Sequence, residues 1–279
     1  MARFASYDGT RLGYHVLGAG PPLVCLPGGP GRASAYFGDL GGLSQSRQLI
    51  LPDTRGTGES DDASDPLSYR CDRLVGDVEA LRAELGLDRM DLLGHSAAAN
   101  LATLYAAAYP GRVARLILLT PGMSALDVDD TEEQWRAALA RRSGEPWYEA
   151  AMAAIEKADA GDDSMENRRA YMPFFYGRWD AAAQAHAGVG VSERSRPVRD
   201  NFRADGAFDP AATRAAVSRL TAPVLCYAGE LDTSPTPAAA AAGARLFPNA
   251  TVTVQPEAAH FPWLDDPAFF TAAITAFLS

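Results

Sequence analysis

A lone serine lies where an apolar run meets an alanine-rich segment, in the stretch 92–99 (LLGHSAAA). A strand that turns directly into a helix leaves no room for large side chains beside the turn, so we interpret Gly94 and Ala98 as steric necessities. The serine between them, Ser96, is then held in a tight turn with its hydroxyl exposed, which is typical of a nucleophile. The alternative is a helix N-cap, a position that serine also favours.

Size and composition limit the possible classes of protein. A length of 279 residues, 47% of them hydrophobic, suits one large core with a sizeable insertion. The net charge of -10 argues against non-specific binding to nucleic acid or to an anionic membrane. No apolar segment is long enough to span a bilayer and residues 1–20 lack an export signal, so we expect a cytoplasmic location. Cys25 and Cys226 lie in apolar runs and are expected to be buried and reduced.

Short apolar runs alternate with helical patterns along most of the chain, which predicts an α/β fold: an open, mostly parallel sheet with helices on both faces. Strands are expected at 2–7, 12–17, 23–26, 48–51, 90–93, 113–119, 223–228 and 251–254, the first two joined as a hairpin. Helices are expected at 70–85, 97–109, 237–246 and 265–278.

The stretch 122–221 differs from the rest, because it is rich in Ala, Arg, Asp and Glu and has few β-branched runs. Helices are expected there at 131–142, 147–159, 166–175 and 210–220. We therefore predict a core formed by 1–121 and 222–279, with a helical cap, 122–221, inserted after the sixth strand.

An acid and a histidine follow the serine in the chain. Hydrolysis by a serine needs a base that takes the hydroxyl proton and an acid that orients the base. Asp232 and His260 each follow a predicted strand, at the sheet edge where open α/β folds place their sites. We predict a catalytic triad of Ser96, Asp232 and His260, with Glu230 as the alternative acid. The structural alternatives are a helix-capping aspartate and a solvated histidine, but no other histidine follows Asp232.

Two backbone N–H groups are needed to bind the developing oxyanion. One is expected from Ala97, directly after the serine. The other is expected from the loop 27–31 (PGGPG), where glycines allow close approach to a substrate, and we assign Gly29 with Gly28 as the alternative. The loop 53–60 (DTRGTGES) lacks dinucleotide-binding spacing, so we interpret it as scaffold in which an Asp–Arg pair braces a tight turn.

These motifs resemble the α/β-hydrolase superfamily over nearly the whole chain. Within it, the sequences GGPG at 28–31 and DxRGxGxS at 53–60 resemble the prolyl iminopeptidase-like serine peptidases. The resemblance implies an α/β-hydrolase fold with a helical cap, and removal of an N-terminal residue, often proline, from short peptides without metal or cofactor. The chain departs from that family at Pro27, usually histidine, and after the serine, where the family usually has tryptophan and glycine. Both departures alter the wall beside the serine, and therefore affect whether the site selects proline.

An aminopeptidase must bind a free ammonium group, for which carboxylates are best suited. Candidates in the predicted cap are Glu145, Glu149, Glu156, Glu166 and Glu193. The alternative for each of them is a solvated charge on a helix surface, which is usual for acidic residues. Aromatic residues of the cap are further candidates: Tyr171, Phe174, Phe175, Tyr176 and Trp179. They could line an apolar pocket together with Trp263, but for most of them we favour a structural role in the packing of the cap.

Two further functions compete with the aminopeptidase. One is a carboxylesterase or lactonase with the same triad and an apolar acyl pocket, and the other is a ligand-binding homologue without turnover. Epoxide hydrolases and dehalogenases are disfavoured because they need a carboxylate in place of Ser96. The expected partner is a small-molecule or short-peptide substrate, with neither nucleic acid nor membrane, and the sequence leaves the oligomeric state open.

Overall fold

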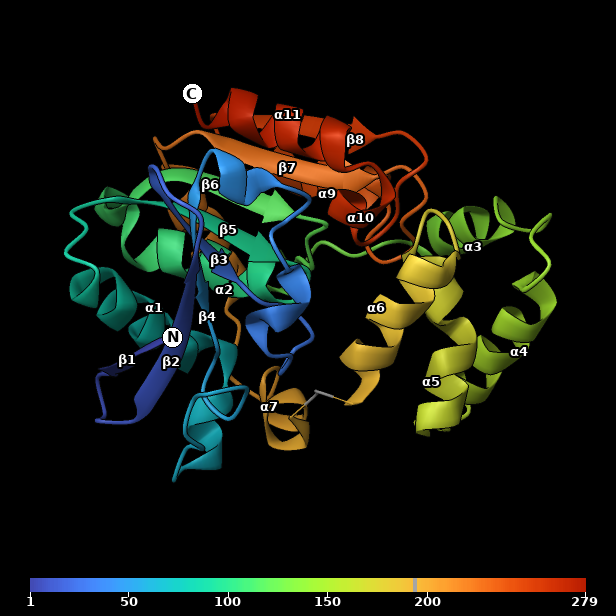
Figure 1. The fold of residues 1–279 in the computed structure, drawn as a ribbon, viewed down its shortest axis with the longest axis horizontal. Helices are drawn as coiled ribbons and strands as arrows, with labels where there is room; N and C mark the ends of the chain where they lie inside the picture. The colour runs from blue at the N-terminus through green and yellow to red at the C-terminus, as the bar shows by residue number, and fades with distance from the viewer. Residues whose placement is uncertain (193–194) are drawn as a thin grey trace.

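Across residues 1–192 and 195–279, which the computed structural model describes, the chain forms an eight-stranded sheet (Figure 1). The strand order is β1-β2-β4-β3-β5-β6-β7-β8. The pairs β1–β2 and β2–β4 are antiparallel, whereas the strands from β4 onward in this order are parallel. The strands are β1 (Ala2–Ala5), β2 (Arg11–Leu17), β3 (Pro22–Leu26), β4 (Gln48–Pro52), β5 (Met90–His95), β6 (Val113–Leu119), β7 (Val224–Gly229) and β8 (Ala250–Gln255). The predicted mostly parallel sheet is thus confirmed.

Helices cover both faces of this sheet, as the alternating pattern predicts. The helices associated with the sheet are α1 (Cys71–Glu84), α2 (Ala98–Ala108), α8 (Pro210–Val217), α9 (Pro237–Ala244), α10 (Pro262–Asp265) and α11 (Pro267–Phe277). Among the described residues, no helix combines the length and the apolar character that crossing a membrane requires.

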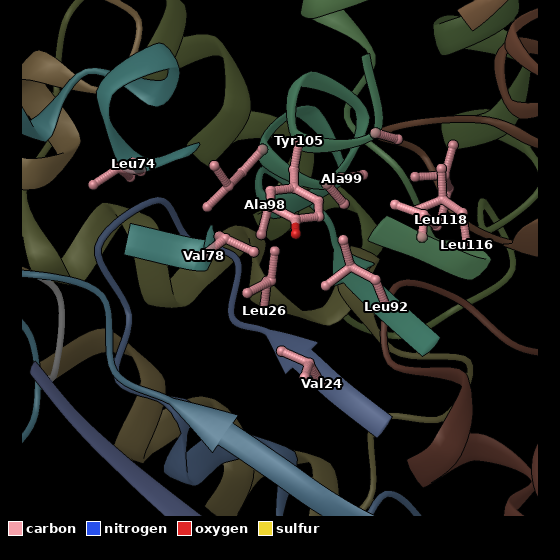
Figure 2. Close-up of a cluster of buried hydrophobic side chains, with 14 of the residues drawn as sticks. Val24, Leu26, Leu74, Val78, Leu92, Ala98, Ala99, Tyr105, Leu116 and Leu118 are labelled. Atoms are coloured by element: carbon pink, nitrogen blue, oxygen red, sulfur yellow. The ribbon is translucent and has the colours of Figure 1, made fainter. Parts of the chain in front are cut away.

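Alternate residues of the central strands face opposite helical layers. Val24 and Leu92 belong to a buried cluster that includes Tyr105 of α2 (Figure 2). Their chain neighbours Leu23 and Leu93 belong to a second cluster on the opposite face, together with residues of α11. Each such leucine or valine contributes roughly 1.5–3 kcal/mol by leaving water, so the two clusters fix the register of the sheet.

The stretch between β6 and β7 carries helices that extend away from the sheet. In Figure 1, α3 to α6 gather at one side of the sheet, and α7 lies closer to the start of the chain. These helices are α3 (Glu132–Ala140), α4 (Tyr148–Asp159), α5 (Met165–Tyr171), α6 (Ala181–Ser192) and α7 (Arg196–Asn201). The sequence analysis anticipated no helix at α6 or α7, and its boundaries for core and cap stay a prediction.

Cys25 and Cys226 are buried free thiols, as the sequence analysis expects, and Cys71 is a third buried free thiol. Burial raises the pKa of the Cys226 thiol to about 12 and also raises that of Cys25. Neither thiol is ionised near neutral pH, so neither acts as a nucleophile.

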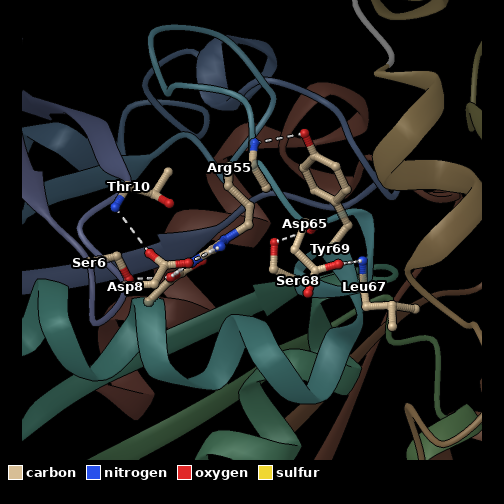
Figure 3. Close-up of polar contacts among 10 residues, drawn as sticks. Ser6, Asp8, Thr10, Arg55, Asp65, Leu67, Ser68 and Tyr69 are labelled. Atoms are coloured by element: carbon tan, nitrogen blue, oxygen red, sulfur yellow. Dashed lines mark hydrogen bonds and ion pairs between the residues drawn. The ribbon is translucent and has the colours of Figure 1, made fainter.

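Arg55 is fully buried and joins three parts of the core (Figure 3). Its guanidinium donates to Asp77 on α1 (Nε to Oδ2, 2.8 Å) and to Asp8 in the β1–β2 turn (Nη1 to Oδ2, 2.7 Å). The expected pairing with Asp53 is wrong, because Asp53 instead accepts the N–H of Ser34 (2.7 Å). The loop after β4 is therefore braced by two separate networks.

We expect Arg55→Met to lower the free energy of unfolding by about 3–5 kcal/mol, because it leaves the Asp77 carboxylate buried without its cation. Chemical denaturation of purified protein measures this loss. Arg136→Met is the matched control, since Arg136 forms an exposed pair with Glu132 on α3. The control should change stability by less than about 1 kcal/mol, and equal losses in both variants would contradict the assignment.

Candidate active site

The turn between β5 and α2 holds Ser96 in an unusual backbone conformation. Its φ angle is 55°, in the left-handed region that side chains other than glycine rarely adopt. The Ser96 N–H donates to the carbonyl of Leu119 on β6 (2.9 Å). A Cβ atom at Gly94 would lie 2.5 Å from the carbonyl oxygen of Ala98 and 2.8 Å from the Ala102 Cβ atom. The turn thus requires glycine two residues before the serine.

The Ser96 hydroxyl points to His260 rather than capping the helix. The distance from Ser96 Oγ to His260 Nε2 is 2.8 Å, and His260 Nδ1 lies 2.8 Å from Asp232 Oδ2. Asp232 is completely buried, and its other oxygen accepts the N–H of Ser234 (3.0 Å). The residue that precedes α2 is Ala97, so the N-cap interpretation of the serine is wrong.

These three side chains come from loops that follow β5, β7 and β8. The three strands run parallel, so their carboxyl ends meet at one edge of the sheet. Glu230, the alternative acid, makes other contacts: it pairs with Arg141 (2.6 Å) and accepts the N–H of Glu257 (3.1 Å).

The backbone of His260 is held from two sides. Its N–H donates to the carbonyl of Phe175, just after α5 (3.1 Å). Its carbonyl accepts from Thr120 Oγ1 (3.1 Å) and from His95 Nε2 (3.0 Å). The position of the histidine therefore depends on the strand β5 as well as on the helical stretch after β6.

His95, the residue before the serine, connects this histidine to the glycine loop. Burial lowers the pKa of His95 well below its ordinary value, so the ring is neutral. Since its Nε2–H donates to His260, its Nδ1 accepts from the Tyr36 hydroxyl (2.7 Å). The Tyr36 oxygen in turn accepts the N–H of Gly28 (2.9 Å). Sequence reasoning missed this chain, and only the position of His95 beside the serine could have suggested it.

The same contact distinguishes the two glycines of the loop after β3. The Gly28 N–H already donates to the Tyr36 hydroxyl. Gly29 and Ala97 both line the cavity over Ser96, and neither N–H has an acceptor within the described residues. A Cβ atom at Gly28 would lie 2.9 Å from the Ser96 Cβ atom, so the loop approaches the serine as closely as glycine permits.

A cavity of about 440 Å³ opens over Ser96 and His260. That volume falls in the range of small-ligand sites. Part of its wall is apolar and is formed by Tyr171, Met172 and Phe175. A smaller cavity, of about 140 Å³, also reaches Ser96 and contains acidic residues after β6.

The cap carboxylates that the structure describes among the candidates for binding an ammonium group do not line this cavity. Glu149, Glu156 and Glu166 are exposed on helices, and Glu145 pairs with Arg142 (3.3 Å). None of these four lines the cavity, and Glu193 lies outside the described residues.

The aromatic candidates divide between wall and packing. Tyr171 and Phe175 line the cavity, whereas Phe174 packs against Trp147 and Tyr148 within the helical stretch. The other three belong to the cluster shared with α11: Tyr176, Trp179 and Trp263.

Arginines are the charged residues that sequence reasoning missed at this site. Five of the described residues that line the larger cavity are arginines: Arg32, Arg168, Arg196, Arg199 and Arg203. Asp163 is the single carboxylate among the described lining residues. The sequence feature that could have revealed them is the spacing of Arg196, Arg199 and Arg203, but these lie in a segment where we expected no helix.

Comparison with known proteins gives the family. A family model described as the alpha/beta hydrolase fold matches residues 21–267. A proline iminopeptidase of Heyndrickxia coagulans is 34% identical over 125 residues, which is 44% of this chain and 43% of that protein. A proline iminopeptidase of Levilactobacillus brevis is 25% identical over 277 residues, covering 92% of this chain and 88% of the relative. The chain thus spans less than half of the first relative's length.

Solved structures share the whole architecture. The esterase RhEst1 from Rhodococcus sp. ECU1013 has a TM-score of 0.76 and 26% identity, and 99% of this chain aligns with 97% of that one. The site and sheet define a hydrolase fold with a serine at the strand-to-helix turn. The chain belongs to the alpha/beta hydrolase fold family.

His186 of α6 connects the helical stretch to the core beside this site. Its Nε2 donates to the carbonyl of Tyr36 (3.0 Å), and its Nδ1 accepts from the Tyr176 hydroxyl (2.8 Å). Burial, together with the charge of Arg32, lowers the pKa of His186 to about 4. The folded protein therefore holds this ring neutral at pH values where the unfolded chain protonates it.

We expect His186→Gln to be less stable than the wild type at pH 7.5 by about 1–3 kcal/mol, because both hydrogen bonds are disturbed. A lowered pKa stabilises the fold above the unfolded value of about 6.5, and this stabilisation is lost as the pH falls toward about 4. The deficit of the variant should therefore shrink between pH 6.5 and pH 4.5 in urea titrations. A deficit that is equal at both pH values would show that His186 does not titrate in this way.

Proposed function

We propose that the protein is a serine hydrolase that cleaves a small ester or amide through an acyl-enzyme. The observation that carries the proposal is the hydrogen-bonded chain from Ser96 through His260 to Asp232, directly beneath a cavity. A protein that only binds a ligand has no need for a buried carboxylate hydrogen-bonded to a histidine that in turn contacts a serine in a strained backbone conformation. The substrate we propose is a small molecule rather than a nucleic acid or a membrane.

In the first step, His260 Nε2 takes the proton of Ser96 Oγ as the oxygen attacks the substrate carbonyl. Asp232 keeps the Nδ1 proton in place and stabilises the imidazolium that forms. The N–H groups of Gly29 and Ala97 bind the oxyanion, an interaction of roughly 3–4 kcal/mol for each donor. His260 then gives its proton to the leaving group, and the carbonyl–leaving-group bond breaks.

In the second step, water replaces the leaving group. His260 takes a proton from the water, whose oxygen attacks the acyl carbonyl of Ser96. Collapse of the second tetrahedral intermediate returns the proton to Ser96 Oγ and releases the acid.

The charges around the larger cavity favour an ester over a peptide with a free N-terminus. An ammonium group is attracted by carboxylates and repelled by guanidinium groups. Among the described lining residues, arginines outnumber carboxylates by five to one, so this cavity suits a substrate without an ammonium group. We therefore rank esterase activity first.

Aminopeptidase activity is the second candidate, favoured by the similarity to proline iminopeptidases. The smaller cavity supports it, because Asp129 and Asp130 line it near Ser96. Asp130 is engaged by the backbone N–H of Thr236 (2.9 Å), whereas Asp129 is exposed. Asp129 is thus the carboxylate that would meet a substrate amine.

Hydrolysis of 4-nitrophenyl butyrate and of proline 4-nitroanilide separates the two candidates. We expect faster turnover of the ester, as kcat/KM, because the larger cavity repels the ammonium group of the anilide. The reverse order would make the aminopeptidase the better assignment.

We expect Ser96→Ala to abolish turnover with the fold intact, and Asp232→Asn to lower kcat by about 10³–10⁴-fold, because the neutral amide no longer holds the Nδ1 proton. Glu230→Gln is the matched control for the second variant and should retain most activity. Circular dichroism and the denaturation midpoint check the fold. Turnover by Ser96→Ala, or equal losses in Asp232→Asn and Glu230→Gln, would overturn the proposed triad.

A further inference from the structure

Three of the cavity arginines come from one short segment. Arg196, Arg199 and Arg203 lie on α7 and in the turn that follows it, three and four residues apart. Residues at these spacings share one face of a helix. All three line the larger cavity above Ser96, and Arg203 also lines the smaller one.

This segment is docked onto the loop that approaches the serine. The N–H of Ser195 donates to the carbonyl of Gly31 (2.8 Å). A Cβ atom at Gly31 would lie 2.8 Å from the Ser195 carbonyl oxygen and 3.0 Å from the Val198 Cβ atom, so helix and loop are in close contact. At its other end, the carbonyl of Phe202 accepts the N–H of Cys71 on α1 (3.0 Å). The arginines are therefore held in place by contacts with the core on both sides.

Carboxylates neutralise two of the three arginines. Asp200 lies 3.0 Å from Arg199 and 3.3 Å from Arg196, and Asp163 lies 3.6 Å from Arg199. Arg203 is different, because its guanidinium has no carboxylate partner within the described part of the chain. The unmatched charge of this segment is therefore the one that reaches both cavities beside Ser96.

We propose that Arg203 binds a carboxylate of the substrate, so that the enzyme prefers esters whose acyl chain ends in a free acid. This inference rests on the proposed serine hydrolase function and names its substrate class. A guanidinium presents a planar fork of N–H groups that matches a carboxylate in two parallel hydrogen bonds. Within this segment only one arginine lacks a carboxylate partner among the described residues, which suits a substrate with one carboxylate.

The exposure of Arg203 sets the size of the effect. Its side chain is in contact with solvent, so salt screens its interaction with a bound anion. Hydrogen bonds to charged groups correspond to roughly a tenfold change in affinity each. The preference for an acidic substrate should therefore be about tenfold at low ionic strength and smaller in salt.

Paired esters test the proposal directly. Mono-4-nitrophenyl esters of succinic, glutaric and adipic acid are the acidic substrates. Each is compared with the same 4-nitrophenyl ester whose free carboxylate is masked as a methyl ester, after subtraction of spontaneous hydrolysis. We expect kcat/KM to favour at least one acid over its neutral counterpart by about tenfold. The ratio should fall toward one in Arg203→Gln and in 0.5 M NaCl, where the Debye length is only about 4 Å. Arg136→Gln, an exposed arginine on α3 with a carboxylate partner, should keep the wild-type ratio.

A binding measurement makes the test independent of turnover. Calorimetry compares monomethyl adipate, glutarate and succinate on Ser96→Ala and on Ser96→Ala/Arg203→Gln, and we expect the second variant to bind about tenfold more weakly. Neutral esters that are hydrolysed as well as the acids would overturn this inference and leave the hydrolase assignment standing. If neither an ester nor proline 4-nitroanilide is hydrolysed, the hydrolase assignment fails, and calorimetry still decides the role of Arg203. Equal affinity in the two variants would overturn that role.

Discussion

The left-handed backbone of Ser96 is the constraint on which the rest of the site depends. The conformation is costly for a residue with a side chain, and backbone hydrogen bonds hold it: the Ser96 N–H donates to Leu119 and the Ser96 carbonyl accepts from Gly122. It aims the hydroxyl out of the sheet toward His260 (2.8 Å). It also demands small neighbours, since a Cβ atom would collide at Gly94 before it and at Gly28 across from it. The conformation of Ser96 and the close approach of the glycine loop therefore depend on the same steric contacts.

The position of His260 links this turn to the helical stretch that covers it. Its N–H donates to the carbonyl of Phe175, and Asp265 accepts the N–H of Ala259 (2.8 Å) and the N–H of Gly177 (2.9 Å). Burial raises the pKa of Asp265 to about 6, although its backbone hydrogen bonds oppose the shift. One carboxylate thus ties the loop that carries His260 to the chain that forms the apolar wall.

The sheet, and the approach of Ser96, Asp232 and His260 to one another at its edge, could be predicted because the sequence signals for them are local. A glycine before the serine and apolar strands that end in polar loops are visible without any knowledge of tertiary contacts. The bracing of the loop 53–60 was predicted wrongly, since Arg55 found its partners at distant positions of the chain. The helices α6 and α7 were missed because α6 consists mainly of alanine, glycine and valine without a distinct apolar face, and α7 has only six residues. The charge of the cavity was missed with them.

Covalent labelling by a fluorophosphonate measures most directly whether the turn makes Ser96 a nucleophile. Intact mass followed by peptide mapping should show one phosphonate for each chain, on Ser96 alone. Labelling should be slowed by at least about 10³-fold in His260→Ala and be absent in protein unfolded before the reagent is added, because the reactivity comes from the assembled site. An unlabelled Ser96 in the folded protein, or equal labelling of the folded and unfolded chains, would contradict the assignment.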